Sequence, residues 1–82
     1  MREKRELGIS ENEIPFPLRL RELLRERGIK TAKFGTDTGI ARRIFYKDER
    51  HNKSTLMAIA YYLGITVEEM VEGTTAMDDW YR

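Results

Sequence analysis

Cysteine is missing from this chain of 82 residues, and proline and histidine are scarce, with two and one respectively. The lack of cysteine excludes a disulfide framework and any thiolate metal site or nucleophile. A chain without disulfides is compatible with a reducing cytoplasm. No apolar run approaches the roughly 18–20 residues of a membrane span, and the N-terminal MREKRELGIS carries charges where a signal peptide is apolar. We therefore expect one small cytoplasmic domain without a membrane segment.

Basic residues are nearly missing from the end of the chain, so the two parts of the chain carry net charge of opposite sign. Residues 1–53 hold 14 Lys and Arg against nine Asp and Glu, whereas residues 54–82 hold one Arg against five Asp and Glu. The formal charge of +1 thus hides a basic half and an acidic half. This asymmetry suggests a polyanionic partner for the basic half, although charge runs are often only solvated faces.

Sustained alternation of apolar and polar residues is also absent, and apolar residues instead return at intervals of three and four. This spacing predicts helices and no strands. Prolines, glycines and capping residues, among them the hydroxyl of Thr31, set the expected bounds of five helices. The predicted helices are Pro17 to about Arg27, Thr31 to Gly39, Ala41 to about Glu49, one from the cap Asn52 to Gly64, and one from the capping box at Thr66 to Gly73. The expected fold is therefore a compact, all-α, five-helix domain.

The expected domain organisation has three parts. Residues 1–14 have few large apolar side chains and form a flexible N-terminal arm. Residues 15–74 form the helical domain, and residues 75–82 form a C-terminal tail.

The second and third predicted helices are joined by a tight turn, which predicts a helix-turn-helix. Gly35 is small where the third helix would cross, Gly39 permits the sharp turn, and Phe45 can fill the angle between the helices. A plain helical corner in a bundle would use the same three positions. These three positions therefore do not distinguish a DNA-binding helix-turn-helix from a plain corner, and the residues on the outer face of the third helix must decide.

The outer face of the third predicted helix is basic. Arg42 and Arg43 come first, with Tyr46 and Lys47 one turn later, so these side chains can project together into a major groove and offer donors to guanine. Thr31 and Lys33, at the start of the second helix, are expected to bind phosphate. Taken singly, each of these residues suits a solvated surface equally well, and the clustering favours DNA.

The runs LRLRELLRERGIKTAKFGTDTGIARR and STLMAIAYYLGITVEEMVEGT resemble the Cro and phage-repressor class of bacterial helix-turn-helix regulators. The resemblance covers about residues 16–74. It implies a lambda-repressor-like fold, with the third helix as recognition helix and double-stranded DNA bound by a homodimer. Carried over by motif, base contacts fall on Ala41, Arg42, Arg43, Tyr46 and Lys47. Phosphate contacts fall on Thr31, Lys33, Arg50 and Lys53.

Enzymatic residues are scarce. His51 is the single histidine and lies in a hydrophilic segment, so neither a metal site nor a histidine-based nucleophile is expected. Glu68 and Glu69 fit helix-start charges better than a catalytic pair. We expect no enzymatic activity, no cofactor and no small-molecule ligand.

Several apolar side chains in the acidic half could form a contact surface between two copies. These candidate dimer contacts are Tyr61, Tyr62, Met70, Trp80 and Tyr81. Alternatively, Trp80 and Tyr81 fold back over the small core. The sequence leaves both arrangements open.

The sequence thus predicts a sequence-specific transcriptional regulator, most simply a repressor. An alternative from another class is a helical protein-interaction module, similar to an antitoxin or anti-repressor, that binds a basic protein through its acidic and aromatic C-terminal half.

Overall fold

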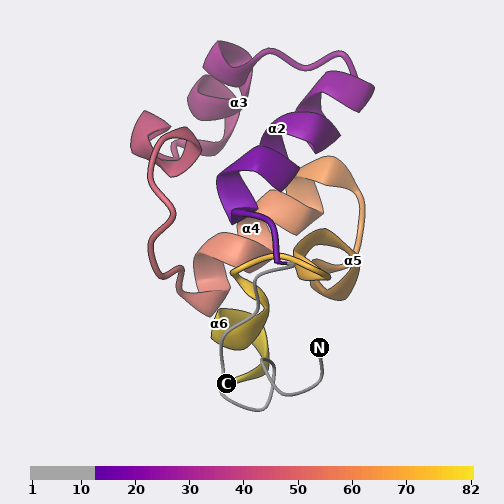
Figure 1. The fold of residues 1–82 in the computed structure, drawn as a ribbon. Coiled ribbons are helices and arrows are strands. Elements are labelled where there is room, and N and C mark those ends of the chain that lie inside the picture. The colour runs from indigo at the N-terminus through magenta and orange to yellow at the C-terminus, as the bar shows by residue number, and fades with distance from the viewer. Residues whose placement is uncertain (1–12) are drawn as a thin grey trace.

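The computed structural model describes residues 13–82, and this part of the chain is helical (Figure 1). The elements are α2 Phe16–Glu26, α3 Thr31–Thr38, the 3₁₀ turn η1 Arg42–Phe45, α4 Lys53–Leu63, α5 Val67–Val71 and α6 Met77–Tyr81. The all-α prediction is confirmed. The predicted arm over 1–14 lies outside the described residues except for its last two. No helix among residues 13–82 is long and apolar enough to cross a membrane.

Helix α2 contributes five buried residues to the interior of the fold. Pro15 occupies its N-cap, Pro17 lies in its first turn, and Gly28, with φ of 68°, follows its end. Proline suits a helix start because the N–H group that it lacks has no partner within the helix at that position. Glycine suits a helix end because it adopts positive φ without strain. The buried residues of the helix are Phe16, Pro17, Leu20, Leu23 and Leu24.

One hydrophobic core joins all the elements up to the start of α6. Phe34 of α3 is fully buried, with its ring centroid 5.5 Å from that of Phe45 in η1 and 5.4 Å from that of Tyr62 in α4, both in edge-on geometry. Such edge-on pairs are favourable arrangements of aromatic rings. The core is completed by Ile44, Leu56, Ile59, Ala60, Leu63, Val67, Met70, Val71 and Ala76.

The predicted caps of α4 and α5 are present. Asn52 Oδ1 accepts the backbone N–H of Thr55 at 2.9 Å, and Gly64 ends α4 with φ of 75°. Thr66 and Glu69 form the reciprocal capping box at 3.1 and 3.2 Å. Each cap satisfies backbone groups that a helix end leaves unpaired.

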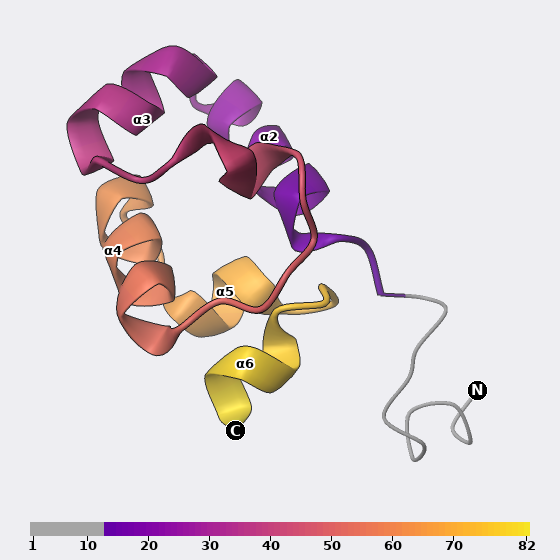
Figure 2. The same cartoon turned by 90° about the vertical axis from the view of Figure 1, so that its left-hand side faces the viewer.

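The predicted third helix is wrong in extent. Only Arg42–Phe45 are helical, as a 3₁₀ turn, and Ala41 has the extended angles φ −61° and ψ 146°. Figure 2 shows the following segment leaving η1 and running as irregular chain to the start of α4. Its polar groups bond to the C-terminal segment: Thr75 Oγ1 donates to Asp48 at 2.6 Å, and the His51 backbone N–H donates to Asp79 at 2.8 Å. These contacts hold residues 46–52 away from a helical path.

The C-terminal segment contains a helix that was not predicted. Helix α6 follows Ala76 and packs against α4 and α5, with Met77 and Trp80 half-buried against the core. Thr74 is fully buried; its hydroxyl donates to Val71 O at 2.7 Å and accepts the Ala76 N–H at 3.2 Å. Ile14 bridges to the same segment, because its N–H donates to Gly73 O and its carbonyl accepts from Thr75 N, both at 3.0 Å.

Candidate nucleic-acid interface

The turn between α3 and η1 is fixed by local hydrogen bonds. Gly39 adopts φ of 75° and its N–H donates to Gly35 O at 2.8 Å. Thr38 Oγ1 donates to Phe34 O at 2.8 Å and accepts the Ile40 N–H at 3.2 Å. A residue with a side chain would be strained at Gly39. The turn therefore sets how η1 is presented relative to α3.

Gly35 is not required for a close helix crossing, contrary to the prediction. A Cβ placed there would lie 3.7 Å from Ile40 O, an ordinary van der Waals contact. The reason is that η1 is short and extended chain precedes it, so no long helix crosses α3 at this point.

The residues predicted to contact bases all lie on or beside η1, and all are exposed. Arg43 Nε lies 3.5 Å from Glu49 Oε2 in an ion pair whose arginine side chain is 73% exposed. The Arg21 guanidinium lies 5.3 Å from the ring centroid of Tyr46, a cation–π contact from α2. Within residues 13–82, Arg42 and Lys47 have no ion pair.

The start of α3 differs from the prediction in its cap. Lys30, not Thr31, occupies the N-cap, and no side chain caps the helix. Lys33 Nζ lies 3.1 Å from Asp37 Oδ2, which also accepts the Tyr62 hydroxyl at 2.7 Å. The Tyr62 hydrogen bond and then Lys33 hold the pKa of Asp37 below its ordinary value, and the same hydrogen bond raises the pKa of Tyr62. Lys33 is exposed but already paired.

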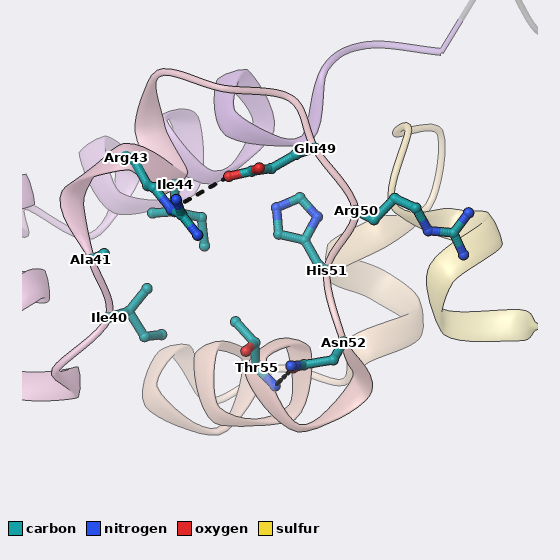
Figure 3. Close-up of a pocket in the computed structure, with 9 residues that line it drawn as sticks. All are labelled: Ile40, Ala41, Arg43, Ile44, Glu49, Arg50, His51, Asn52 and Thr55. Carbon is teal, nitrogen blue, oxygen red and sulfur yellow. Dashed lines mark hydrogen bonds and ion pairs between the residues drawn. The ribbon is translucent and has the colours of Figure 1, made fainter.

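The other two predicted phosphate contacts are engaged by the C-terminal segment. Arg50 pairs with Asp79 at 3.3 Å, and its side chain points away from η1 (Figure 3). Lys53 Nζ donates to Arg82 O at 3.1 Å and lies 5.7 Å from the Trp80 ring centroid. The structure therefore does not gather Arg50 and Lys53 with the exposed cations of η1.

The predicted dimer contacts have unequal exposure. Met70 is fully buried in the core, so its assignment to a contact surface is wrong. Tyr62 is half-buried and bonded to Asp37, and Trp80 is half-buried against the core, whereas Tyr61 and Tyr81 are 89% and 61% exposed. Met57, one turn before Tyr61 on α4, is 54% exposed. Trp80 thus covers the core, while Tyr81 does not.

His51 was also misjudged. Its side chain is only 6% exposed and lies edge-on to Phe16, with ring centroids 4.9 Å apart. Burial lowers the pKa of His51 below its ordinary value, against the opposing effect of the carboxylates of Asp79, Asp48 and Glu49. The sequence did not indicate that His51 is buried, because its neighbours along the chain are charged and polar. No group of His, Asp and Glu within residues 13–82 could hold a metal ion.

Comparison with known proteins agrees with this geometry. A family model described as the Cro/C1-type HTH DNA-binding domain matches residues 19–75, which run from α2 through α5 and include η1. Searches of curated proteins and of solved structures found no match. The family match spans more than half of the chain and covers the α3–turn–η1 unit. The chain therefore belongs to the Cro/C1-type helix-turn-helix DNA-binding domain family, a family of DNA-binding regulators.

Proposed function

We propose that this protein is a sequence-specific repressor that binds an operator in bacterial or phage double-stranded DNA and acts from the cytoplasm by occupying it. The observation that carries the proposal is the placement of Arg42: exposed, at the start of η1, and without an ion pair within residues 13–82. A free guanidinium can donate two hydrogen bonds to guanine in the major groove. Lys47 supplies a second exposed cation on the same segment, which likewise has no ion pair with any of residues 13–82.

The short recognition element defines how the groove is read. A turn of four residues presents fewer side chains than a full recognition helix, so Ala41, Arg42, Arg43, Tyr46 and Lys47 are proposed to act from η1 and the extended chain on either side of it. Arg43 contributes to base reading only when its pair with Glu49 opens. Tyr46 is kept in place by Arg21 of α2.

Phosphate binding is proposed for the start of α3. Thr31 and Lys33 are exposed there, and the uncapped first turn offers backbone N–H groups to an anion. Such contacts fix the register on the duplex without reading sequence. Arg50 and Lys53 are proposed to contribute less, because both are engaged by residues 79–82.

Two copies are proposed to bind one operator. Met57 and Tyr61 are exposed apolar side chains one turn apart on α4, and a dimer would cover them. A dimer places its two reading elements one turn of DNA apart, about 34–36 Å.

The alternative of an acidic protein-interaction module loses support from the roles of two carboxylates. Glu69 completes the capping box of α5, and Asp79, whose side chain is 7% exposed, binds the His51 N–H and Arg50. These acidic groups stabilise the fold and are not free to capture a basic partner.

Selection of bound duplexes from a random-sequence pool tests the proposal, followed by titration of the winning duplex and a scrambled duplex at two salt concentrations. An enriched motif bound well over tenfold tighter than the scrambled duplex is expected, and two inverted half-sites about 10 base pairs apart would identify a dimer. Recovery of no motif, with binding that vanishes at the higher salt, would reject sequence-specific recognition.

A further inference from the structure

Helix α2 ends beside the start of α3, and an open hollow of about 560 Å³ lies at this junction (Figure 1). Three cationic side chains line the hollow: Arg21 and Arg25, one turn apart on α2, and Lys30, the N-cap residue of α3. All three are exposed, and none of them has an ion pair with any of residues 13–82. These three residues form the cationic rim of the hollow, and the described part of the chain leaves their charge unneutralised.

The cationic rim connects two parts of the proposed DNA interface. Thr31, which lines the same hollow, begins α3, where phosphate binding is proposed. At the other end of the rim, the Arg21 guanidinium lies 5.3 Å from the ring centroid of Tyr46, the residue that follows η1. Because η1 packs against α2, this contact places the rim next to the reading element (Figure 2). One continuous surface therefore runs from the start of α3 along α2 to the end of η1.

The wall between the cations is apolar. Leu24 and Ile29 supply it, and the lining residues include no Asp or Glu. A sugar–phosphate strand alternates charged phosphates with less polar deoxyribose rings, so a cationic rim around an apolar wall is complementary to it. Binding of phosphates by Arg and Lys releases counterions and supplies affinity without reading bases. A hollow cannot enter a groove, whereas the backbone is the outermost part of a duplex, and the backbone is therefore the part of DNA that fits.

Other cations that could bind phosphate are engaged within the fold. Arg50 and Lys53 are held by residues 79–82. Arg27, also at the end of α2, lies 4.0 Å from Glu26 and donates to a backbone carbonyl of its own helix at 3.3 Å. The residues of the cationic rim differ from these three because none of them has an ion pair within residues 13–82.

We propose that the cationic rim is a further DNA site, which binds the sugar–phosphate backbone beside the groove that η1 enters. Arg25 and Lys30 each bind one phosphate, and Arg21 binds a neighbouring phosphate while it contacts Tyr46. Ile29 contacts a deoxyribose ring between them. The site adds affinity that does not depend on base sequence, and it fixes how the duplex lies across α2. This inference rests on the proposed function in that duplex DNA is the ligand of η1.

The test is the salt dependence of the affinity of the full chain for the selected duplex and for scrambled duplex DNA. The double variant Arg25→Gln/Lys30→Gln removes two charges and keeps long, polar side chains at both exposed positions. The slope of the logarithm of the association constant against the logarithm of the salt concentration should become shallower by about 1.8, because each phosphate contact contributes about 0.9. The same change is expected with both duplexes, since phosphates carry no sequence information.

Arg27→Gln is the matched control, because it removes a charge from the same end of α2 but not from the cationic rim, and it should leave the slope nearly unchanged. An unchanged slope in the double variant, or a shift of about 0.9 in Arg27→Gln, overturns the proposal. A loss of affinity confined to the selected duplex would assign Arg25 and Lys30 to base reading and also overturns it.

The failure of the rim and the failure of the proposed function give different results. A shallower slope on scrambled DNA, without any motif recovered by selection, would support the rim and reject the sequence-specific repressor. A recovered motif with an unchanged slope in the double variant would reject the rim alone. Binding of neither duplex by the wild type would reject both.

Discussion

Two neighbouring regions of the molecule are built in different ways. The α4–α5 region is specified locally, because Asn52, Gly64 and the Thr66–Glu69 box each bond within a few residues. The segment 41–52 is held by distant residues, since Asp48 bonds to Thr75 and the His51 N–H bonds to Asp79. Local signals give regular helices in α4 and α5, whereas long-range contacts shape the segment that is proposed to face DNA.

The largest expected effect comes from the residue that joins both regions. Phe34→Ala removes a fully buried ring in edge-on contact with Phe45 and Tyr62, and should lower the free energy of unfolding by about 3–5 kcal/mol. Urea unfolding measures the loss. Leu18→Ala, at a 47% exposed position on α2, is the control and should cost far less. Similar values for the two variants would contradict a shared core.

Removing the contact between His51 and Asp79 should loosen the segment 41–52 and leave α4 unchanged. Asp79→Ala takes away the acceptor of the His51 N–H and the partner of Arg50, and should cost about 1–3 kcal/mol of unfolding free energy. Hydrogen exchange should accelerate at the His51 amide while the α4 amides keep their protection. The exposed neighbour Asp78→Ala is the matched control. Equal acceleration in α4 would show that the two regions are not independently held.

Substitution by alanine should change stability in opposite directions at Gly39 of the turn and at Gly35 inside α3. Gly39→Ala places a side chain at φ of 75° and should destabilise the fold by about 1–2 kcal/mol. Gly35→Ala meets only an ordinary contact inside α3 and should stabilise it by up to about 1 kcal/mol. Thermal unfolding distinguishes the two. Destabilisation by Gly35→Ala would contradict this and would support the predicted close crossing at Gly35.

The smallest expected effect is a pH dependence in the segment 41–52. Because burial lowers the pKa of His51 below its ordinary value of 6.5, the unfolded chain binds this proton more readily than the folded chain. The free energy of unfolding is therefore not reduced by His51 above about pH 6.5, and it decreases as the pH drops below that value. Urea unfolding at pH 7.5 and 5.5 should show a larger loss for the wild type than for His51→Gln. Equal losses in both proteins would mean that His51 is not responsible.

The sequence predicted most of the fold because most helix ends carry local signals. Helices α2, α3, α4 and α5 begin and end within a few residues of the predicted bounds, where proline, glycine and capping side chains act on their own neighbourhood. Helix α6 was missed although Asp78 and Asp79 lie in its first turn, a signal that favours a helix start.

The candidate site was predictable in composition but not in conformation. Arg42 and Lys47 are exposed on one segment, as the clustering suggested. The path of residues 46–52 depends on hydrogen bonds from Asp48 and His51 to partners 27–28 residues away, and the His51 ring packs against Phe16, contacts that no local pattern reveals. The ion pair of Arg43 with Glu49 likewise follows from the path of the irregular segment.

The most direct test of the central claim, that DNA is read by cations on a short turn, is the affinity of Arg42→Ala for the selected duplex and for scrambled DNA. Arg82→Ala is the control, because that arginine is also exposed but lies at the C-terminus, away from η1. We predict that Arg42→Ala weakens the selected duplex by about 1–3 kcal/mol, well beyond its effect on scrambled DNA, while Arg82→Ala has little effect. Equal weakening of both duplexes by Arg42→Ala, or unchanged affinity, would contradict the account.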